Sequence, residues 1–279
     1  MTQVQNVPGV RLNDGHEIPQ LGFGVYQVPP EETERAVSTA LETGYRHIDT
    51  AAAYENEEGV GRAIKSSGLQ REEVFVTTKL PNPEHGREST LRAFDGSLER
   101  LGFDYVDLYL IHWPVPTREL YVETWKTFEE LHEQGHARSI GLSNFQPEHI
   151  DRLLAESRTA PTVNQIELHP YHAQRELRAY DREHGIATEA WSPIGQGGEV
   201  LEDPVIERIA SPHDKSPAQI IIRWHLQIGN VVIPKSETPE RIRANFEVFD
   251  FTLTDDEVGQ IDRLDRGERL GPDPDTFGS

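Results

Sequence analysis

Cysteine is absent from the 279-residue chain, which excludes a disulfide framework, a thiolate metal site and a cysteine nucleophile. The chain also lacks any run of about 18 apolar residues, the length that a membrane-spanning helix requires. Its first residues, MTQVQNVPGV, contain neither a basic segment nor an apolar core, so we expect no signal peptide. Together these absences predict a cytoplasmic protein without a membrane partner.

Basic residues are scarce, and lysine is the scarcest of them. The chain carries 48 acidic residues against 27 basic ones, for a net charge of −21, and only five of the basic residues are lysines. Such a surface repels nucleic acid and anionic membranes. One interpretation is a basic protein partner, but that usually requires an acidic block, and none is present. We favour adaptation to a very salty cytoplasm, in which screening removes the repulsion between carboxylates, and expect no obligate protein partner.

Short apolar runs alternate with longer amphipathic segments from one end of the chain to the other. Alternating strands and helices predict a parallel sheet, and eight units of this length favour an α/β fold that closes into a (β/α)8 TIM barrel. No linker or shift in composition divides the chain, so we expect residues 1–279 to form a single domain. The expected strands, each followed by a helix, cover residues 21–25, 45–50, 73–80, 105–113, 137–144, 161–168, 185–192 and 230–236.

A segment before the first unit also bears on the fold. Residues 10–19, VRLNDGHEIP, precede the first unit and predict a β-hairpin with an Asp-Gly turn, which is expected to close the bottom of the barrel.

An open sheet that binds a dinucleotide needs a Gly-x-Gly-x-x-Gly turn after its first strand. GFG at 22–24 and GVG at 59–61 do not complete this pattern, and the second lies within an expected helix. A Rossmann domain is therefore not expected.

Polar side chains gather where the expected strands end. In a barrel of this type the active site is built at the carboxyl ends of the strands. Taken singly, each residue has a structural alternative, such as a lysine at a solvated strand end or a core histidine bonded to a backbone carbonyl. On one rim they indicate a catalytic site. They are Asp49, Lys79, His112, Ser143, Asn144, Gln165, Trp191, Ser192, Lys235 and Ser236.

Six stretches resemble the aldo-keto reductase family over essentially the whole chain: GYRHIDTAAAYENEEGVGRAI, VFVTTKL, DLYLIHWP, SIGLSNF, NQIELHP and IPKSETPERIRANF. Within that family the chain most resembles the bacterial and archaeal branch that includes the 2,5-diketo-D-gluconate reductases. The resemblance implies NAD(P)H-dependent reduction of aldehydes or ketones to alcohols. It assigns Asp49, Tyr54, Lys79 and His112 as the catalytic residues.

The chemistry of these four side chains agrees with that assignment. A carbonyl gains a hydride at carbon and a proton at oxygen, and Tyr54 is the natural proton donor. A phenol with a pKa near 10 is a poor acid at neutral pH, so we expect the ammonium of Lys79, held in place by Asp49, to lower the pKa of Tyr54 toward neutrality. His112 is expected to orient the carbonyl oxygen through a hydrogen bond.

The hydride must come from a cofactor, because no side chain donates one. The resemblance implies NADPH, with NADH as the alternative. The N–H groups at the free helix N-terminus near Thr238 can bind the 2′-phosphate of NADPH. Glu237 adds a negative charge beside that phosphate and weakens the preference for NADPH, as does Ala244 at a position that is often acidic. The resemblance assigns residues to each part of the cofactor. The carboxamide of the nicotinamide is assigned to Ser143, Asn144 and Gln165, and the nicotinamide ring to Trp191, where tyrosine is usual. The pyrophosphate is assigned to Ser192, Ile194, Gly195 and Gln196, the 2′-phosphate to Lys235, Ser236, Thr238 and Arg241, and the adenine to Asn245.

The substrate is less well defined than the reaction. Tyr26, Asn82, His112, Trp113 and the loops that follow residues 113 and 195 are expected to wall its pocket. Because the chain after Arg269 is short, we expect an open pocket that accepts small aldehydes, α-dicarbonyls or keto-sugars.

One motif matches the pattern of a different function. HEQGH at 132–136 matches the zinc-protease pattern and makes a zinc-dependent hydrolase the alternative. That chemistry needs both histidines on one continuous helix, whereas Gly135 is expected to follow the helix end, with His136 beyond it. We therefore expect no metal. A non-catalytic barrel that senses nicotinamide is a third candidate, and the complete set of four catalytic residues argues against it.

Overall fold

The computed structural model describes residues 7–278, so most of the segment in which we expect no signal peptide lies outside the described residues. One sheet contains eight parallel strands in the order β10-β9-β8-β7-β6-β5-β4-β3. Each strand falls within a range predicted from the sequence. The strands are β3 (Phe23–Gly24), β4 (His47–Asp49), β5 (Phe75–Leu80), β6 (Val106–Ile111), β7 (Ala137–Ser143), β8 (Val163–Glu167), β9 (Ala187–Trp191) and β10 (Val231–Val232).

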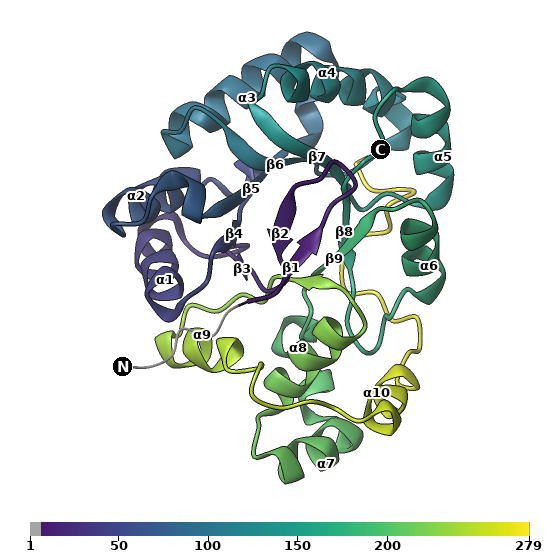
Figure 1. Ribbon diagram of the computed structural model, residues 1–279. Coiled ribbons are helices and arrows are strands. Elements are labelled where there is room, and N and C mark those ends of the chain that lie inside the picture. The colour runs from purple at the N-terminus through teal and green to yellow at the C-terminus, as the bar shows by residue number, and fades with distance from the viewer. Residues whose placement is uncertain (1–6, 279) are drawn as a thin grey trace.

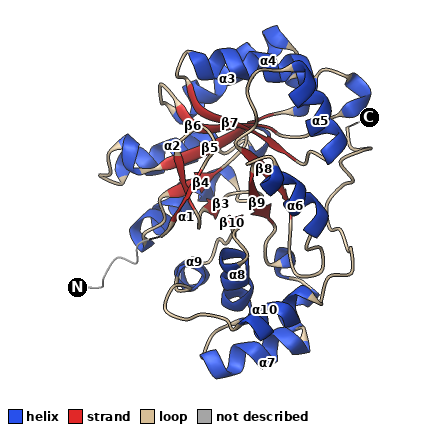
Figure 2. Ribbon diagram, turned by 45° about the vertical axis from the view of Figure 1, so that its right-hand side comes forward, coloured by secondary structure: helices blue, strands red, loops and turns tan. Residues whose placement is uncertain are grey.

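The helices lie outside the curved sheet (Figures 1 and 2). Local capping defines several of their ends: the hydroxyl of Ser216 accepts a hydrogen bond from the amide of Gln219, and Gly44 ends the first helix with a φ of 124°. The helices are α1 (Pro30–Thr43), α2 (Glu57–Ser66), α3 (Arg87–Leu101), α4 (Tyr121–Glu133), α5 (Pro147–Glu156), α6 (Arg175–Glu183), α7 (Pro204–His213), α8 (Pro217–Gln227), α9 (Pro239–Phe246) and α10 (Asp255–Asp262). Within residues 7–278, none of them has the length and apolar character to cross a bilayer.

Strand β10 is shorter than predicted, and it contacts the other end of the sheet. Pro234 has no N–H group, so it cannot continue the ladder, and residues 233–236 lead instead into helix α9. The amide of Gly22 donates to Val232 O at 2.9 Å, and the amide of Val232 donates to Gln20 O at 2.9 Å. The segment that precedes β3 is thus hydrogen-bonded to β10, although the two strands stand at opposite ends of the strand order.

The predicted N-terminal hairpin is confirmed. Strands β1 (Gly9–Arg11) and β2 (Glu17–Pro19) pair antiparallel and cross the centre of the curved sheet in Figure 1. Ile18 is fully buried in an apolar cluster with Val163 and Val231, the first residues of β8 and β10. The hairpin therefore covers the amino ends of the strands and leaves their carboxyl ends accessible.

Candidate active site

A cavity of about 1350 Å³ lies at the carboxyl ends of the strands. Of the residues predicted to form the site, only Lys79 and Gly195 do not line it: Lys79 is fully buried next to the cavity, and Gly195 packs its backbone against Val200. The other predicted residues line the wall: Tyr26, Asp49, Tyr54, Asn82, His112, Trp113, Ser143, Asn144, Gln165, Trp191, Ser192, Ile194, Gln196, Lys235, Ser236, Thr238, Arg241 and Asn245.

Three neighbouring strands and a single helical turn bring the four expected catalytic residues together. Asp49 ends β4, Lys79 stands in β5, and His112 follows β6 directly. Tyr54 closes a 3-10 turn (Ala52–Tyr54) in which small side chains allow the chain to bend back over the strand ends. Glu55 follows in the left-handed conformation, with a φ of 57°. This turn places Tyr54 near Lys79, which belongs to the next strand.

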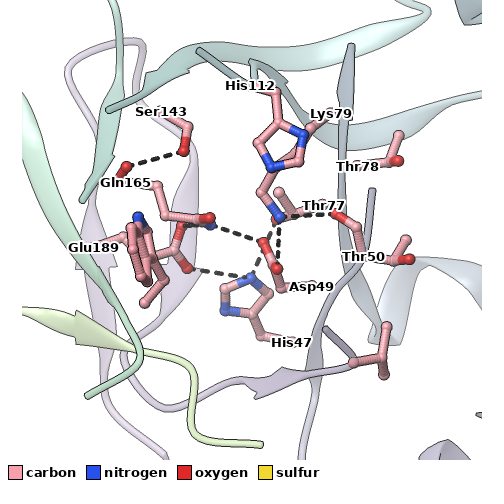
Figure 3. Close-up of polar contacts among 12 residues, drawn as sticks. His47, Asp49, Thr50, Thr77, Thr78, Lys79, His112, Ser143, Gln165 and Glu189 are labelled. Atoms are coloured by element: carbon pink, nitrogen blue, oxygen red, sulfur yellow. Dashed lines mark hydrogen bonds and ion pairs between the residues drawn. The ribbon is translucent and has the colours of Figure 1, made fainter. Parts of the chain in front are cut away.

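Lys79 and Asp49 form a buried ion pair (Figure 3). Lys79 Nζ lies 2.7 Å from Asp49 Oδ1 and donates to the carbonyl of Thr50 at 2.8 Å. The two side chains are 0% and 3% exposed. Burial opposes the charge of Lys79, but the neighbouring Asp49 and Tyr54 outweigh it and raise the pKa of Lys79. Lys79 therefore stays an ammonium ion at neutral pH.

Tyr54 and His112 face each other beside this ammonium. The Tyr54 ring lies 5.1 Å from Lys79 Nζ and 5.7 Å from the His112 ring. Burial raises the pKa of Tyr54 to about 12, although Lys79 opposes the shift. The expected fall toward neutrality is therefore wrong for the free protein, because desolvation of the phenolate outweighs the attraction of one ammonium. Burial, together with the charge of Lys79, lowers the pKa of His112 to about 3, so His112 is a neutral imidazole.

Hydrogen bonds with neighbouring residues hold Asn144 in the cavity wall. Its amide nitrogen donates to the carbonyl of His112 at 3.0 Å and to Ser143 Oγ at 3.1 Å. Its Oδ1 accepts a hydrogen bond from the indole of Trp191 at 2.8 Å. Tryptophan at this position thus adds an N–H donor that fixes the ring against Asn144, a contact that the sequence did not predict.

A second buried carboxylate, Glu189, was missed from the sequence. The amide nitrogen of Gln165 donates to Asp49 Oδ2 and to Glu189 Oε2, each at 2.8 Å. The other oxygen of Glu189, Oε1, lies 3.6 Å from His47 Nε2 (Figure 3). Burial and the charge of Asp49 raise the pKa of Glu189 to about 8. A signal was present: Glu189 stands two residues before Trp191 in β9, so both side chains point to the same face of the sheet.

The far end of the cavity is more exposed. Lys235 Nζ lies 2.6 Å from Glu237 Oε1, and these side chains are 32% and 42% exposed. Helix α9 begins beyond Thr238, whose side chain makes no capping hydrogen bond, so N–H groups of the first turn stay free for an anion. Among residues 7–278, the side chain of Arg241 has no hydrogen bond or ion pair.

The chain after Arg269 forms part of the cavity wall, a contact that was not predicted. The amides of Leu270 and Gly271 donate to the carboxylate of Glu167, which holds this tail against the cavity. Phe277 packs on Trp113 with ring centroids 4.5 Å apart. A short tail becomes a wall because one buried carboxylate anchors its backbone.

Comparisons with known proteins place the chain in a family. Residues 20–266 match the model of the aldo/keto reductase family. The chain belongs to the aldo/keto reductase family. It is 59% identical over 270 residues to an aldo-keto reductase of Mycolicibacterium smegmatis, a match that covers 97% of this chain and 98% of the relative. It is 54% identical over 270 residues to the methylglyoxal reductase DkgA of Escherichia coli, covering 96% and 98%. The crystal structure of a Gox0644 variant in complex with NADPH superposes with a TM-score of 0.94 at 46% identity, covering 99% of this chain and all of that one.

The zinc-protease pattern has no matching geometry in this aldo-keto reductase. Helix α4 ends at Glu133, and Gly135 follows with a φ of 77°. His136 therefore lies beyond the helix, while His132 Nδ1 is 3.1 Å from the carbonyl of Ala137. No group of three histidine or carboxylate side chains placed to hold a metal occurs in residues 7–278.

Proposed function

We propose that this protein reduces aldehydes and ketones to alcohols with NADPH, and that α-dicarbonyls such as methylglyoxal are its preferred substrates. The observation that carries the proposal is the buried pair of Lys79 and Asp49 next to Tyr54 and His112 at one end of a large cavity. Membership of the aldo/keto reductase family supports the reaction class. The methylglyoxal reductases among its relatives support the substrate class.

The four residues divide the proton chemistry among them. When bound, NADPH supplies the hydride. Neutral His112 donates a hydrogen bond to the carbonyl oxygen and orients it. Tyr54, which is protonated at neutral pH, donates its proton to the same oxygen, and the ammonium of Lys79 stabilises the phenolate that remains. Asp49 keeps Lys79 charged and in position.

The described residues fit a nicotinamide adenine dinucleotide phosphate. Polar side chains from the ends of β7, β8 and β9 lie at the catalytic end of the cavity, where the nicotinamide belongs. Arg241 and the free N–H groups of α9 lie at the other end, which suits the 2′-phosphate. The complex of Gox0644 with NADPH, a close structural neighbour, supports this cofactor. NADH is the weaker alternative, and Glu237 keeps the difference modest.

Closure of the sheet and the domain organisation complete the proposal. The hydrogen bonds of Gly22 with Val232, and of Gly24 with Pro234 at 3.2 Å, support a closed (β/α)8 barrel. A single domain over residues 1–279 is supported by the one sheet to which every unit contributes a strand. A cytoplasmic location, adaptation to high salt and the absence of an obligate protein partner stay predictions.

The proposed function is tested with a panel of carbonyl substrates in molar potassium chloride. Reduction of each substrate is monitored through the loss of NADPH absorbance. The panel contains methylglyoxal, a simple aldehyde of similar size, a keto-sugar and a bulky aromatic ketone. We expect the highest kcat/KM with methylglyoxal, and no change in rate when a chelator is added. Absence of reduction throughout the panel, while NADPH still binds, favours a sensing barrel. Loss of activity with the chelator that zinc restores favours a hydrolase instead.

A further inference from the structure

The amide of Gln165 is held between two carboxylates. Its nitrogen lies 2.8 Å from Asp49 Oδ2 and 2.8 Å from Glu189 Oε2, and all three side chains are buried. An amide nitrogen carries two hydrogens, and both are used here. Gln165 also lines the cavity. Its oxygen, Oε1, is therefore the only polar atom that it has left to present.

The two carboxylates dictate which way this amide points. If the amide were turned over, its oxygen would face Asp49 and Glu189 at hydrogen-bond distance, and two acceptors repel each other. Burial raises the pKa of Asp49 and the ammonium of Lys79 opposes that shift; Oδ1 accepts a hydrogen bond from Lys79, and Oδ2 faces the Gln165 amide. Glu189 Oε2 lies at hydrogen-bond distance from the Gln165 amide, whereas Oε1 has no hydrogen-bond partner in residues 7–278 and lies 3.6 Å from His47 Nε2. Oε1 is therefore the oxygen that can carry a proton, which leaves Oε2 as an acceptor.

The two polar side chains next to Gln165, Ser143 and Asn144, already donate all their hydrogens within the protein. Both hydrogens of the Asn144 amide are donated, to His112 O and to Ser143 Oγ. The hydroxyl of Ser143 donates to the carbonyl of Gln165 at 3.0 Å. Among these three side chains, Gln165 Oε1 is thus an acceptor that remains available for the N–H group of the carboxamide.

We propose that Glu189 is a positioning residue, which with Asp49 fixes the amide of Gln165 so that Oε1 selects the N–H group of the nicotinamide carboxamide. The inference rests on the proposed use of NADP(H). Glu189 touches neither the cavity wall nor the reacting atoms and acts only through Gln165. Its consequence is a cofactor site that requires a donor on the carboxamide.

Two nucleotide analogues separate the two halves of the carboxamide. The 3-acetylpyridine analogue of NADP⁺ keeps the oxygen but replaces the amide nitrogen with a methyl group. The thionicotinamide analogue keeps the nitrogen and changes the oxygen. We expect the wild-type protein to bind the acetylpyridine analogue about five- to tenfold more weakly than NADP⁺, the effect of one lost hydrogen bond. The thionicotinamide analogue should bind within about twofold of NADP⁺, because its N–H group is intact.

Substitutions of Glu189 then test the orientation itself, with dissociation constants measured by calorimetry. In Glu189→Gln, the new amide can donate to Gln165 Oε1 and allow Gln165 to turn, so the discrimination against the acetylpyridine analogue should fall to about twofold. Glu189→Met removes an acceptor without adding a donor, so its discrimination should lie between those of Glu189→Gln and the wild type. A merely structural role predicts the reverse order, because methionine is the larger chemical change.

Asp181 provides the matched control. It is another fully buried carboxylate, it accepts hydrogen bonds from Asn164 and Thr188, and it does not line the cavity. Asp181→Asn should leave the discrimination unchanged. A fragment of NADP⁺ that lacks the nicotinamide should bind all folded variants equally well.

The possible outcomes are distinct. Unchanged discrimination in both Glu189 variants overturns the inference, and so does a wild-type protein that binds the two analogues equally. Equal loss for the nicotinamide-free fragment also overturns it, because the damage is then general. Failure of the proposed function looks different: none of the nucleotides binds to the wild-type protein.

Discussion

Two ion pairs of nearly equal length stand at opposite ends of the same cavity. Lys79 and Asp49 are 2.7 Å apart and almost fully buried. Lys235 and Glu237 are 2.6 Å apart, but about a third or more of each side chain is exposed. Burial, not distance, decides what each pair does. In the low dielectric of the interior the first pair has no alternative partner in water, whereas the second exchanges freely with solvent and salt.

The difference suits the two tasks. Proton transfer needs charges whose positions do not change, and the buried end provides them before any ligand binds. Recognition of a phosphate needs cationic side chains that can leave their partners in the free protein and bind the phosphate. At the exposed end, Lys235 must leave Glu237 to reach the phosphate, while Arg241 is already free. We therefore expect large effects from changes at the buried end and modest, salt-dependent effects at the exposed end.

The largest effect should come from Tyr54→Phe. This change removes the proton donor but leaves the ring, so the rate of carbonyl reduction should fall by about 10²- to 10⁴-fold. NADPH binding should survive, because no proposed cofactor contact is lost. Stopped-flow reduction of methylglyoxal and a fluorescence titration with NADPH measure the two effects separately. Undiminished turnover in this variant rules out the mechanism.

The next effect tests the comparison of the two pairs directly. Asp49→Asn leaves the Lys79 ammonium buried without its carboxylate, which should lower the free energy of unfolding by about 3–5 kcal/mol. Lys235→Met is the matched change at the exposed pair and should cost less than about 1 kcal/mol. Urea unfolding of both variants gives these values. Equal costs for the two changes contradict the view that burial separates the pairs.

How much of this was predictable depends on how local the cause is. The strands and helices were predicted because apolar periodicity and capping residues act over a few positions, and the rim position of Asp49, Lys79 and His112 follows from the topology. Strand β10 was predicted too long because the effect of Pro234 on the ladder was not considered.

Features that depend on contacts between distant segments were not predicted. Glu189 was missed because acids are rarely buried without an evident partner, and its partner Gln165 comes from another strand. The contact of the tail with the cavity wall was not predicted because its anchor, Glu167, lies about a hundred residues earlier in the chain. The pKa of Tyr54 was misjudged because a sequence shows the neighbouring charge but not the amount of desolvation.

A smaller effect is expected at the exposed end from Arg241→Ala. The variant should bind NADPH about tenfold more weakly, since a charge-assisted contact is worth roughly 1.5–3 kcal/mol when well formed and less when exposed. Binding of NADH, which lacks the 2′-phosphate, should change little. Equal losses for the two cofactors show that Arg241 does not contact the phosphate.

Glu237→Gln sharpens the same test in the opposite direction. Without its carboxylate, Lys235 is free to meet the phosphate, so NADPH binding should strengthen by about two- to fivefold while NADH binding stays constant. The gain should shrink in molar potassium chloride because the site is exposed to screening. A gain that is equal for both cofactors shows that Glu237 acts on some other part of the nucleotide.

The smallest effect should be that of pH on the buried end. An ordinary histidine gains a proton as the pH falls through about 6.5, and a protonated imidazole beside Lys79 would add a second positive charge to the site. The pKa of His112 is lowered to about 3, so His112 stays neutral as the pH falls. The pKa of Tyr54 is raised to about 12, so the donor keeps its proton as the pH rises. We therefore expect kcat/KM for methylglyoxal, measured at constant ionic strength, to show no inflection from His112 or Tyr54 between about pH 5 and 9. An inflection near pH 6.5 that disappears in His112→Asn contradicts a neutral, desolvated histidine and with it the contrast between the two ends of the cavity.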